Sequence, residues 1–430
     1  MTSLDSMIAT AGEAPLANSL DFSLPPASTA IVDRRQHKRA FPTSASTLSY
    51  TQGTKTIRLR LGGDCFVDPH SIRLMFTIKN GDATNALSFQ TGPWGAWGQV
   101  YLRSSGVEID NILAYGRHHQ QFLWNNLSQV EQFGETGITG LHGSWLGGTP
   151  LNIPRLGTIP ANSSYTVMHK LGLSILASGK MLPVRYCPLE LELSLTNNAT
   201  DWLTGGAGNS TTFSLENVQL LYDEVVPDEA VLDSFYKALM ASRVLTIPCL
   251  TAYVISTALT PGQSSFSYAA VRAFSRVSHV YLSFKNTAQA KNASFINPTT
   301  ITNNAGAAPS LSDAAGGAPN CPYARLSIGS KYYPDPQPMQ TIPELFYAYQ
   351  KSLPNIPNIG RDQYQFSAFS IAFDLRRIPE DPTSSISTRS GDLLRVELQN
   401  LTNADATVMW MTIFAFSTVA IREQGVVLLT

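Results

Sequence analysis

The segment that most constrains the fold lies in mid-chain, at residues 220–248, LLYDEVVPDEAVLDSFYKALMASRVLTIP. It begins as an apolar strand, which we expect to break at Asp223-Glu224 and Pro227. The apolar spacing that follows predicts a short amphipathic helix, and a new strand begins near residue 244. Two β-rich halves of nearly equal length flank this segment. We therefore interpret it as a helical connector between two copies of one β-domain.

Landmarks of the first half return in the same order in the second half, about 200 residues later. The matched segments are residues 71–80 and 277–286, 99–107 and 323–333, the helical segment from Ile112 and 343–353, 189–200 and 394–407, and 213–225 and 408–421. One such similarity would mean little, because β-proteins share turn sequences. Several in one order favour a tandem repeat.

The fold class predicted from this pattern is all-β, with two tandem eight-stranded jelly rolls and short helices in loops and in the connector. A jelly roll suits the pattern because it pairs most of its strands and leaves few free edges. The predicted division is a flexible N-terminal arm at 1–45, a first jelly roll at 46–226, a helical connector at 227–243 and a second jelly roll at 244–430.

The composition is poor in charge, with 14% charged residues and a net charge of −1. Soluble domains usually carry about 25% charged residues, so this surface suits a protein that buries much of its outside against copies of itself. The near-zero net charge argues against a dedicated nucleic-acid binder. With no apolar signal core and no run long enough to span a bilayer, we expect a soluble protein assembled inside a cell.

One basic cluster stands out in the N-terminal arm: Arg34, Arg35, Lys38 and Arg39. The simpler interpretation is a flexible arm that orders only on assembly. The alternative is that these cations contact nucleic acid or an anionic membrane.

The sequence contains no recognisable catalytic, cofactor or metal motif, so we expect no enzyme. None of the four cysteines lies within metal-ligand spacing of another. His118 and His119 are adjacent and point to different sides of a helix, which makes them a poor chelate and favours surface or interface histidines. The acidic pairs Asp223-Glu224 and Asp228-Glu229 flank a turn and a helix start, where acids act as caps.

Three stretches resemble a known family. They are the connector with its flanking strands (Val218 to Ile247), the C-terminal pair of apolar runs (Phe414 to Leu429) and the strand-turn-strand at Trp97 to Asp110. Together with the repeat, they resemble the double jelly-roll major capsid proteins of tailless icosahedral DNA viruses. That lineage includes virophages, Polinton-like viruses, nucleocytoplasmic large DNA viruses and membrane-containing phages.

The resemblance implies a virion protein that self-assembles as homotrimeric, pseudo-hexameric capsomers tiling an icosahedral shell. It implies penton and minor capsid proteins as partners and no small-molecule substrate. The arm would lie at the base of the capsomer, so that Arg34, Arg35, Lys38 and Arg39 face an internal membrane or the genome. The long loops 134–162 and 286–320 are candidates for the outward face.

Two alternatives stay open. A capsid protein with a single shell jelly roll and a protruding β-domain would have unlike halves and a more basic arm. A carbohydrate-binding tandem β-sandwich would use Trp94, Trp97, Trp124 and Trp145 as a sugar-stacking platform.

Overall fold

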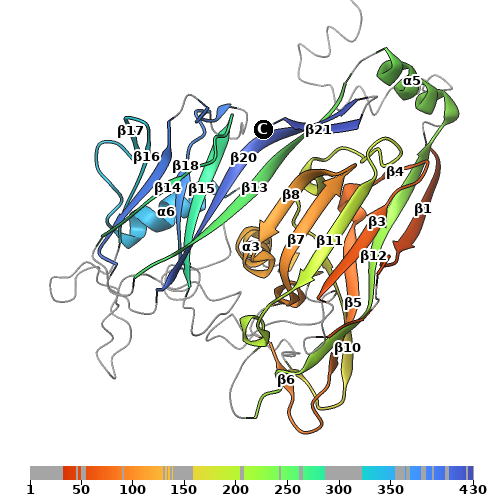
Figure 1. Cartoon of the computed structure of the whole chain (residues 1–430), viewed down its shortest axis with the longest axis horizontal. Coiled ribbons are helices and arrows are strands. Elements are labelled where there is room, and N and C mark those ends of the chain that lie inside the picture. Colours follow the sequence, from red (N-terminus) through yellow and green to blue (C-terminus); the bar gives the residue numbers. More distant parts are fainter. Residues whose placement is uncertain are drawn as a thin grey trace, which may run out of the picture.

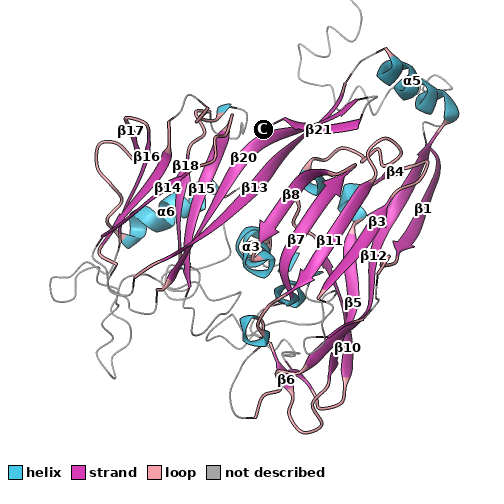
Figure 2. Cartoon of the chain, in the orientation of Figure 1, coloured by secondary structure: helices cyan, strands magenta, loops and turns pink. Residues whose placement is uncertain are grey.

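Two β-sandwiches stand side by side in the computed structural model of the chain (Figure 1). Strands build both sandwiches and helices are few (Figure 2). The structure describes residues 32–44, 47–49, 55–89, 92–128, 131–132, 134–135, 138, 158–203, 208–241, 244–260, 265–285, 322–353, 364, 369–378, 384–389, 392–401, 406–422 and 425–429.

The first sandwich, called the first roll below, packs two sheets face to face. One sheet has the order β1-β12-β5-β10 and the other the order β8-β7-β11-β3. Their bounds are β1 Val32–Ala40, β12 Phe213–Pro227, β5 Arg73–Asn80, β10 Ser164–Lys170, β8 Val107–Leu113, β7 Trp97–Ser104, β11 Leu189–Leu195 and β3 Thr56–Leu61. Shorter strands are β2 Leu48–Ser49 and β4 Phe66–Val67, both paired with β12, and the pair β6 Leu87–Ser88 and β9 Thr158–Ile159.

The second sandwich, the second roll, is built in the same way. One sheet has the order β18-β15-β20-β13 and the other the order β14-β19-β16-β17. Their bounds are β18 Ser370–Asp374, β15 Val277–Lys285, β20 Val408–Arg422, β13 Leu245–Ala258, β14 Ser265–Ala270, β19 Leu394–Gln399, β16 Tyr323–Ile328 and β17 Lys331–Tyr333. A last strand, β21 Gly425–Leu429, pairs with β20.

The two rolls have one strand order. Strand for strand, β1-β12-β5-β10 corresponds to β13-β20-β15-β18, and β3-β11-β7-β8 corresponds to β14-β19-β16-β17. The sequence landmarks fall on corresponding strands: β5 and β15, β7 and β16, β11 and β19, β12 and β20. The predicted double jelly roll is therefore confirmed.

Strand β11 illustrates why these sequences form half-buried strands. Its leucines alternate with polar residues, and every leucine side chain is buried. The two glutamates between them face outward, where Glu192 lies 2.9 Å from Nε of Arg58 on β3 and 3.8 Å from the guanidinium of Arg103 on β7. Opposite charges on neighbouring strands thus fix the register that the leucines require.

Residues 32–40 of the predicted flexible arm at residues 1–45 form the strand β1, which pairs antiparallel with β12. Residues 1–31 lie outside the described part of the chain. The sequence does not mark this strand, because residues 33–39 are all exposed and show no apolar alternation. β1 corresponds to β13, so the first roll includes a strand that precedes its predicted start at residue 46.

The expected break at Asp223-Glu224 is also wrong, because β12 runs through both residues to Pro227. These carboxylates pair with cations of β1 and do not cap a helix. The connector helix α5 spans Glu229–Met240 and places Glu229 in its first turn. It rests on the first roll through Phe235, whose ring centroid lies 5.5 Å from that of Phe66.

The other helices lie in loops. The helix expected from Ile112 begins later, because β8 continues to Leu113 and α3 spans Tyr115–Phe122. Helix α6 spans Ile342–Ser352, where Thr341 and Glu344 form a reciprocal capping box. Single 3-10 turns are η1 Pro69–Ser71, η2 Pro93–Ala96, η3 Trp124–Asn126, η4 Ser174–Ala177 and η5 Ala199–Asp201.

The two cores do not divide at the connector. Side chains from the ends of β13, β20 and β21 belong to the core of the first roll: Ile247, Cys249, Val419, Ile421 and Val426. The buried apolar residues of β20 from Met409 to Ala415 belong to the core of the second roll, against which Tyr253 and Ile255 of β13 also pack. One end of each of the two longest strands of the second half, β13 and β20, therefore packs in the core of the first roll.

The two ends of the molecule differ in the elements that they hold. The connector end of the molecule holds α5, β21 and the start of β1, where Val32 pairs with Pro227. The opposite end holds the last residue of β15, Lys285, paired with Val408 at the start of β20. Asn80 at the end of β5 pairs with Phe213 at the start of β12. The loops 134–162 and 286–320 lie mostly outside the described residues, and their anchoring strand ends lie at this opposite end.

Candidate functional site

The contact between the two rolls, called the seam below, is formed by α3 of the first roll and the outward face of β13, β20 and β15 of the second. Phe122 at the end of α3 packs its ring 4.7 Å from that of Tyr281 and 4.8 Å from that of Phe414. A single parallel bridge between Tyr253 and Asn111 joins β13 to β8, so one sheet runs through both rolls.

Polar groups of α3 cross the seam. The guanidinium of Arg117 donates to Oγ of Ser283 at 3.1 Å and to the carbonyl of Phe284 at 2.7 Å. Gln121 donates to Oγ of Ser370 at 2.6 Å. Burial lowers the pKa of Arg117 to about 9. These bonds set the position of one roll against the other, because a buried donor needs its acceptor in place.

His118 and His119 lie on α3 and are both buried, so of the predicted surface or interface positions the surface position is wrong. They point to different sides of the helix, as adjacent residues should. His118 lies 5.9 Å from the ring of Phe414 in the second roll, whereas His119 stacks at 4.4 Å on Trp94 in the first roll. Burial lowers the pKa of His118 to about 3 and the pKa of His119 well below its usual range.

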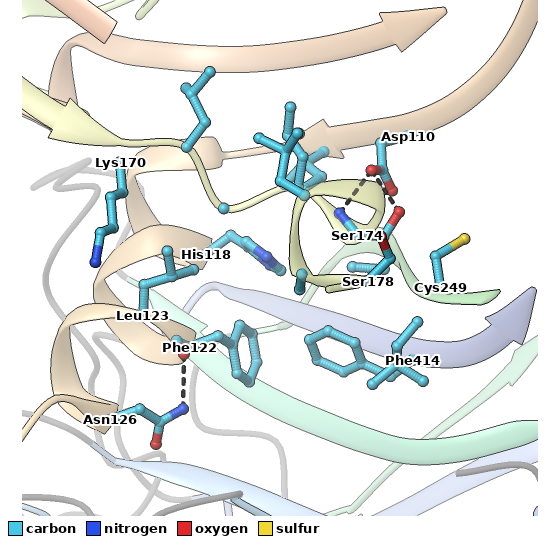
Figure 3. A pocket seen from close by; sticks show the side chains of 18 of the residues that line it. Asp110, His118, Phe122, Leu123, Asn126, Lys170, Ser174, Ser178, Cys249 and Phe414 are labelled. Atoms are coloured by element: carbon cyan, nitrogen blue, oxygen red, sulfur yellow. Dashed lines mark hydrogen bonds between the residues drawn. The ribbon is translucent and has the colours of Figure 1, made fainter. Parts of the chain in front are cut away.

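A groove of about 710 Å³ lies beside α3, between the rolls (Figure 3). The labelled side chains in Figure 3 come from both rolls, with His118 and Phe122 on α3 facing Phe414. Most of its walls are apolar. A groove of this size between two domains leaves their contact incompletely packed.

Asp110 and Cys249 lie at one side of this groove (Figure 3). Oδ2 of Asp110 accepts hydrogen bonds from the backbone nitrogen and hydroxyl of Ser174, at 2.8 and 2.6 Å. Burial raises the pKa of Asp110 to about 6, and burial raises the pKa of the Cys249 thiol to about 12. Both groups are therefore held at the junction of β8, η4 and β13.

A second histidine borders the groove from the other roll. Nδ1 of His279 on β15 lies 2.7 Å from Oγ of Ser278, and its Nε2 lies 3.6 Å from Asp374. Serine, histidine and carboxylate resemble a hydrolytic triad in composition, but Ser278 is completely buried and cannot reach a substrate. Burial lowers the pKa of His279 to about 4, partly offset by Asp374.

The four cations predicted for the arm lie on β1, and two of them have acidic partners. Arg35 lies 2.8 Å from both Asp68 and Asp223, and Lys38 pairs with Glu224. Hydrogen bonds from His37 and Arg35 lower the pKa of Asp223. Arg34 and Arg39 have no acidic partner among the described residues; Arg39 donates to Gln219 at 3.4 Å.

The tryptophans do not form a sugar-binding platform. Trp94, Trp97 and Trp124 are buried in the first roll, and Trp145 lies outside the described residues. Stacking on a sugar needs an exposed ring face. The carbohydrate interpretation is therefore wrong for these three residues.

Metal sites and membrane-spanning helices are absent from the same described ranges. No three His, Cys, Asp or Glu side chains there are placed to share a metal ion. Cys65, Cys187 and Cys249 are free and buried, and Cys321 lies outside these ranges. No helix in them is long and apolar enough to cross a bilayer.

Comparison with solved structures gives the fold a context. The chain aligns with PBCV-1 VP54 fitted into a reconstruction of the virophage Sputnik, with a TM-score of 0.63, 9% identity and coverage of 95% of this chain and 98% of that one. The Faustovirus major capsid protein gives a TM-score of 0.54, 9% identity and coverage of 97% and 96%. The mavirus major capsid protein gives 0.51, 10% identity and coverage of 95% and 92%. No family model and no curated protein sequence matches the chain.

The strand order and these alignments define a class. The chain has the double jelly-roll fold of viral major capsid proteins, over nearly its whole length. At such low identity the likeness is one of fold. The role of α3 in joining the rolls could not be predicted from the sequence, because no pattern in one half indicates which surface the other half covers.

Proposed function

We propose that this protein is the major capsid protein of an icosahedral virus and works as a structural subunit of the virion, not as an enzyme. The observation that supports this most is the pair of rolls with one strand order, upright side by side and fixed across the seam. The fold likeness to major capsid proteins of PBCV-1, Faustovirus and mavirus supports the same role.

The finer proposal is a homotrimeric capsomer. Three chains with two like rolls each would give a six-lobed outline, and such capsomers would tile a shell. The low charge content suits this use, because subunit contacts exclude isolated charges. Penton and minor capsid proteins would complete the shell. The equal strand order of the halves disfavours a single shell roll with an unlike protruding domain.

Light scattering and negative-stain images of the purified chain test the capsomer. We expect a stable particle of three times the chain mass with six lobes, because each chain supplies two equivalent rolls. A monodisperse monomer at micromolar concentration would contradict the proposal. Dimers bearing spikes would instead support the single-roll alternative.

For the N-terminal region we propose that the connector end faces the interior of the virion and that Arg34 and Arg39 contact an internal membrane or the genome. Both are exposed on β1, and neither has an acidic partner among the described residues. Arg35 and Lys38 are less available for such a contact, because they form ion pairs with acidic residues of β12.

Replacing Arg34 and Arg39 with alanine tests that contact. We expect the affinity for vesicles containing anionic lipid, measured by sedimentation, to weaken about 30-fold, since each of the two cations near such a surface contributes about 1 kcal/mol. The matched control removes two exposed cations elsewhere, Arg60 and Lys79, whose side chains are 69% and 53% exposed. Equal losses in both variants, or no loss in the first, would refute a specific role for β1.

A further inference from the structure

The seam contains titratable groups that the structural role does not require. His118 comes from the first roll and His279 from the second, and both line the groove. Both are buried, and Nδ1 of His118 and Nε2 of His279 have no hydrogen-bond partner among the described residues. A protonated imidazole needs an acceptor at each nitrogen. Nδ1 of His118 has none in the described part of the chain, and the carboxylate nearest to Nε2 of His279, Asp374, lies 3.6 Å away and is held by Arg376.

We propose that the seam is an acid-sensitive joint: protonation of His118 and His279 opens the groove between α3 and the facing strands β15 and β20, while each roll stays folded and the ends of β13, β20 and β21 stay in the first core. The groove leaves this part of the seam less closely packed than either core. Both histidines line this groove, so opening it needs no unfolding of either roll.

The surrounding charges favour opening once the histidines are protonated. The titratable and charged groups near them are Arg117 and His119 on α3, Asp110 on β8, Lys170 at the end of β10, Cys249 on β13, Tyr281 on β15, and Asp374 and Arg376 after β18. Asp374 is already held by Arg376 at 2.9 Å. Lys170 is held by Glu135 at 3.1 Å. Two new cations therefore add positive charge on both sides of the seam.

The direction of the pH dependence follows from the pKa values. Burial lowers the pKa of His118 to about 3 and of His279 to about 4, so the closed seam resists protons that the open seam accepts. The closed state is therefore fully stable above about pH 6.5 and is lost as the pH falls toward 4. Each histidine shifts the equilibrium about 20-fold toward the open state between pH 7 and pH 5.

Asp110 acts in the opposite direction. Its pKa, raised to about 6 by burial, means that the closed seam takes up a proton more readily than the open seam. That shift favours the closed state about tenfold over the same range. Two histidines against one carboxyl leave a net shift of about 40-fold toward opening.

The test uses the native thiols as reporters on the full chain. Cys187 and Cys249 are both buried in the first core, but only Cys249 also lines the groove, whereas Cys187 bonds to Ser104. Both would be labelled with 4,4′-dithiodipyridine, which reacts in mild acid, and located by mass spectrometry. Rates are divided by those of the same thiols in the urea-unfolded chain at each pH. We expect the ratio of Cys249 to Cys187 labelling to rise about 40-fold from pH 7 to pH 5.

The variants make the test specific. In the double variant His118→Gln, His279→Gln, Asp110 is the one remaining group of the three that titrate. The ratio of Cys249 to Cys187 labelling should therefore fall about tenfold from pH 7 to pH 5. The control His70→Gln removes an exposed histidine of the same groove and should behave like wild type. Should the double variant fail to fold, each single variant is expected to reduce the wild-type rise about 20-fold.

Three outcomes would overturn the proposal. The first is a wild-type ratio that does not change with pH. The second is joint exposure of Cys249 and Cys187, which would mean that the rolls unfold. The third is a double variant that opens in acid as wild type does. The capsid role is tested separately by the trimer at pH 7, which does not depend on this joint.

Discussion

Ending the chain after Arg422 is expected to lower the free energy of unfolding of the first roll by about 3 kcal/mol, although the lost strand closes the second half. β21 places Val426, only 5% exposed, in the core of the first roll, and Leu428 packs against that core. Burying one such side chain fully and another partly contributes about this amount. Hydrogen exchange should show the loss in β8 and β11 rather than in β16 and β19.

Substitutions within β21 separate this effect from the loss of a strand. Val426→Ser with Leu428→Ser changes the inward side chains and should reproduce most of the destabilisation. Val427→Ser with Leu429→Ser changes the outward side chains, which are 39% and 48% exposed, and should cost less than about 0.5 kcal/mol. Equal effects of the two pairs would show that β21 does not belong to the first core.

The repeat of strand order could be predicted from the sequence because its signals are local. Leucines that alternate with glutamates in β11, and the corresponding leucine and valine pattern in β19, mark half-buried strands in any context. Long apolar runs mark β12 and β20 as strands inside a sheet. Turn residues then separate these strands at similar intervals in both halves.

β1 could not be predicted in the same way, because its stability comes from a partner nearly two hundred residues away. Its side chains from Asp33 to Arg39 are exposed, so no apolar periodicity marks it. What holds it is the ladder to β12 together with the pairing of Arg35 and Lys38 with Asp223 and Glu224. The basic residues that predicted a flexible arm lie on β1, and the acidic residues that predicted a helix cap lie on its partner β12.

The seam was hidden for a related reason. Helix α3 carries arginine, histidine and glutamine at positions that a single roll would expose to water. Arg117, His118 and Gln121 contact the second roll, which covers them, whereas His119 packs on Trp94 of the first roll. The sequence of either half does not show which surface the other half will cover. The buried ends of β13 and β20 in the first core have the same origin.

Replacing Arg117 with alanine is expected to lower the free energy of unfolding by about 3 kcal/mol. The residue is only 4% exposed, and its removal leaves the Phe284 carbonyl and the Ser283 hydroxyl buried without a donor, beside a new cavity. Burial lowers the pKa of Arg117 to about 9, so part of this loss is offset when the charge is removed. Urea unfolding at pH 7 measures the change.

Comparison with Arg117→Met distinguishes the bonds from the charge. Methionine fills much of the space without a charge, so we expect a cost of about 1 kcal/mol less than with alanine. A double-mutant cycle with Ser283→Ala should give a coupling of about 1 kcal/mol, because the two residues share one bond. The control Arg103→Ala, on β7 with its side chain 38% exposed, should cost under about 1 kcal/mol. If Arg117→Ala were as mild as this control, the polar bonds of α3 would not hold the rolls together, and packing of Phe122 against Tyr281 and Phe414 would have to do so alone.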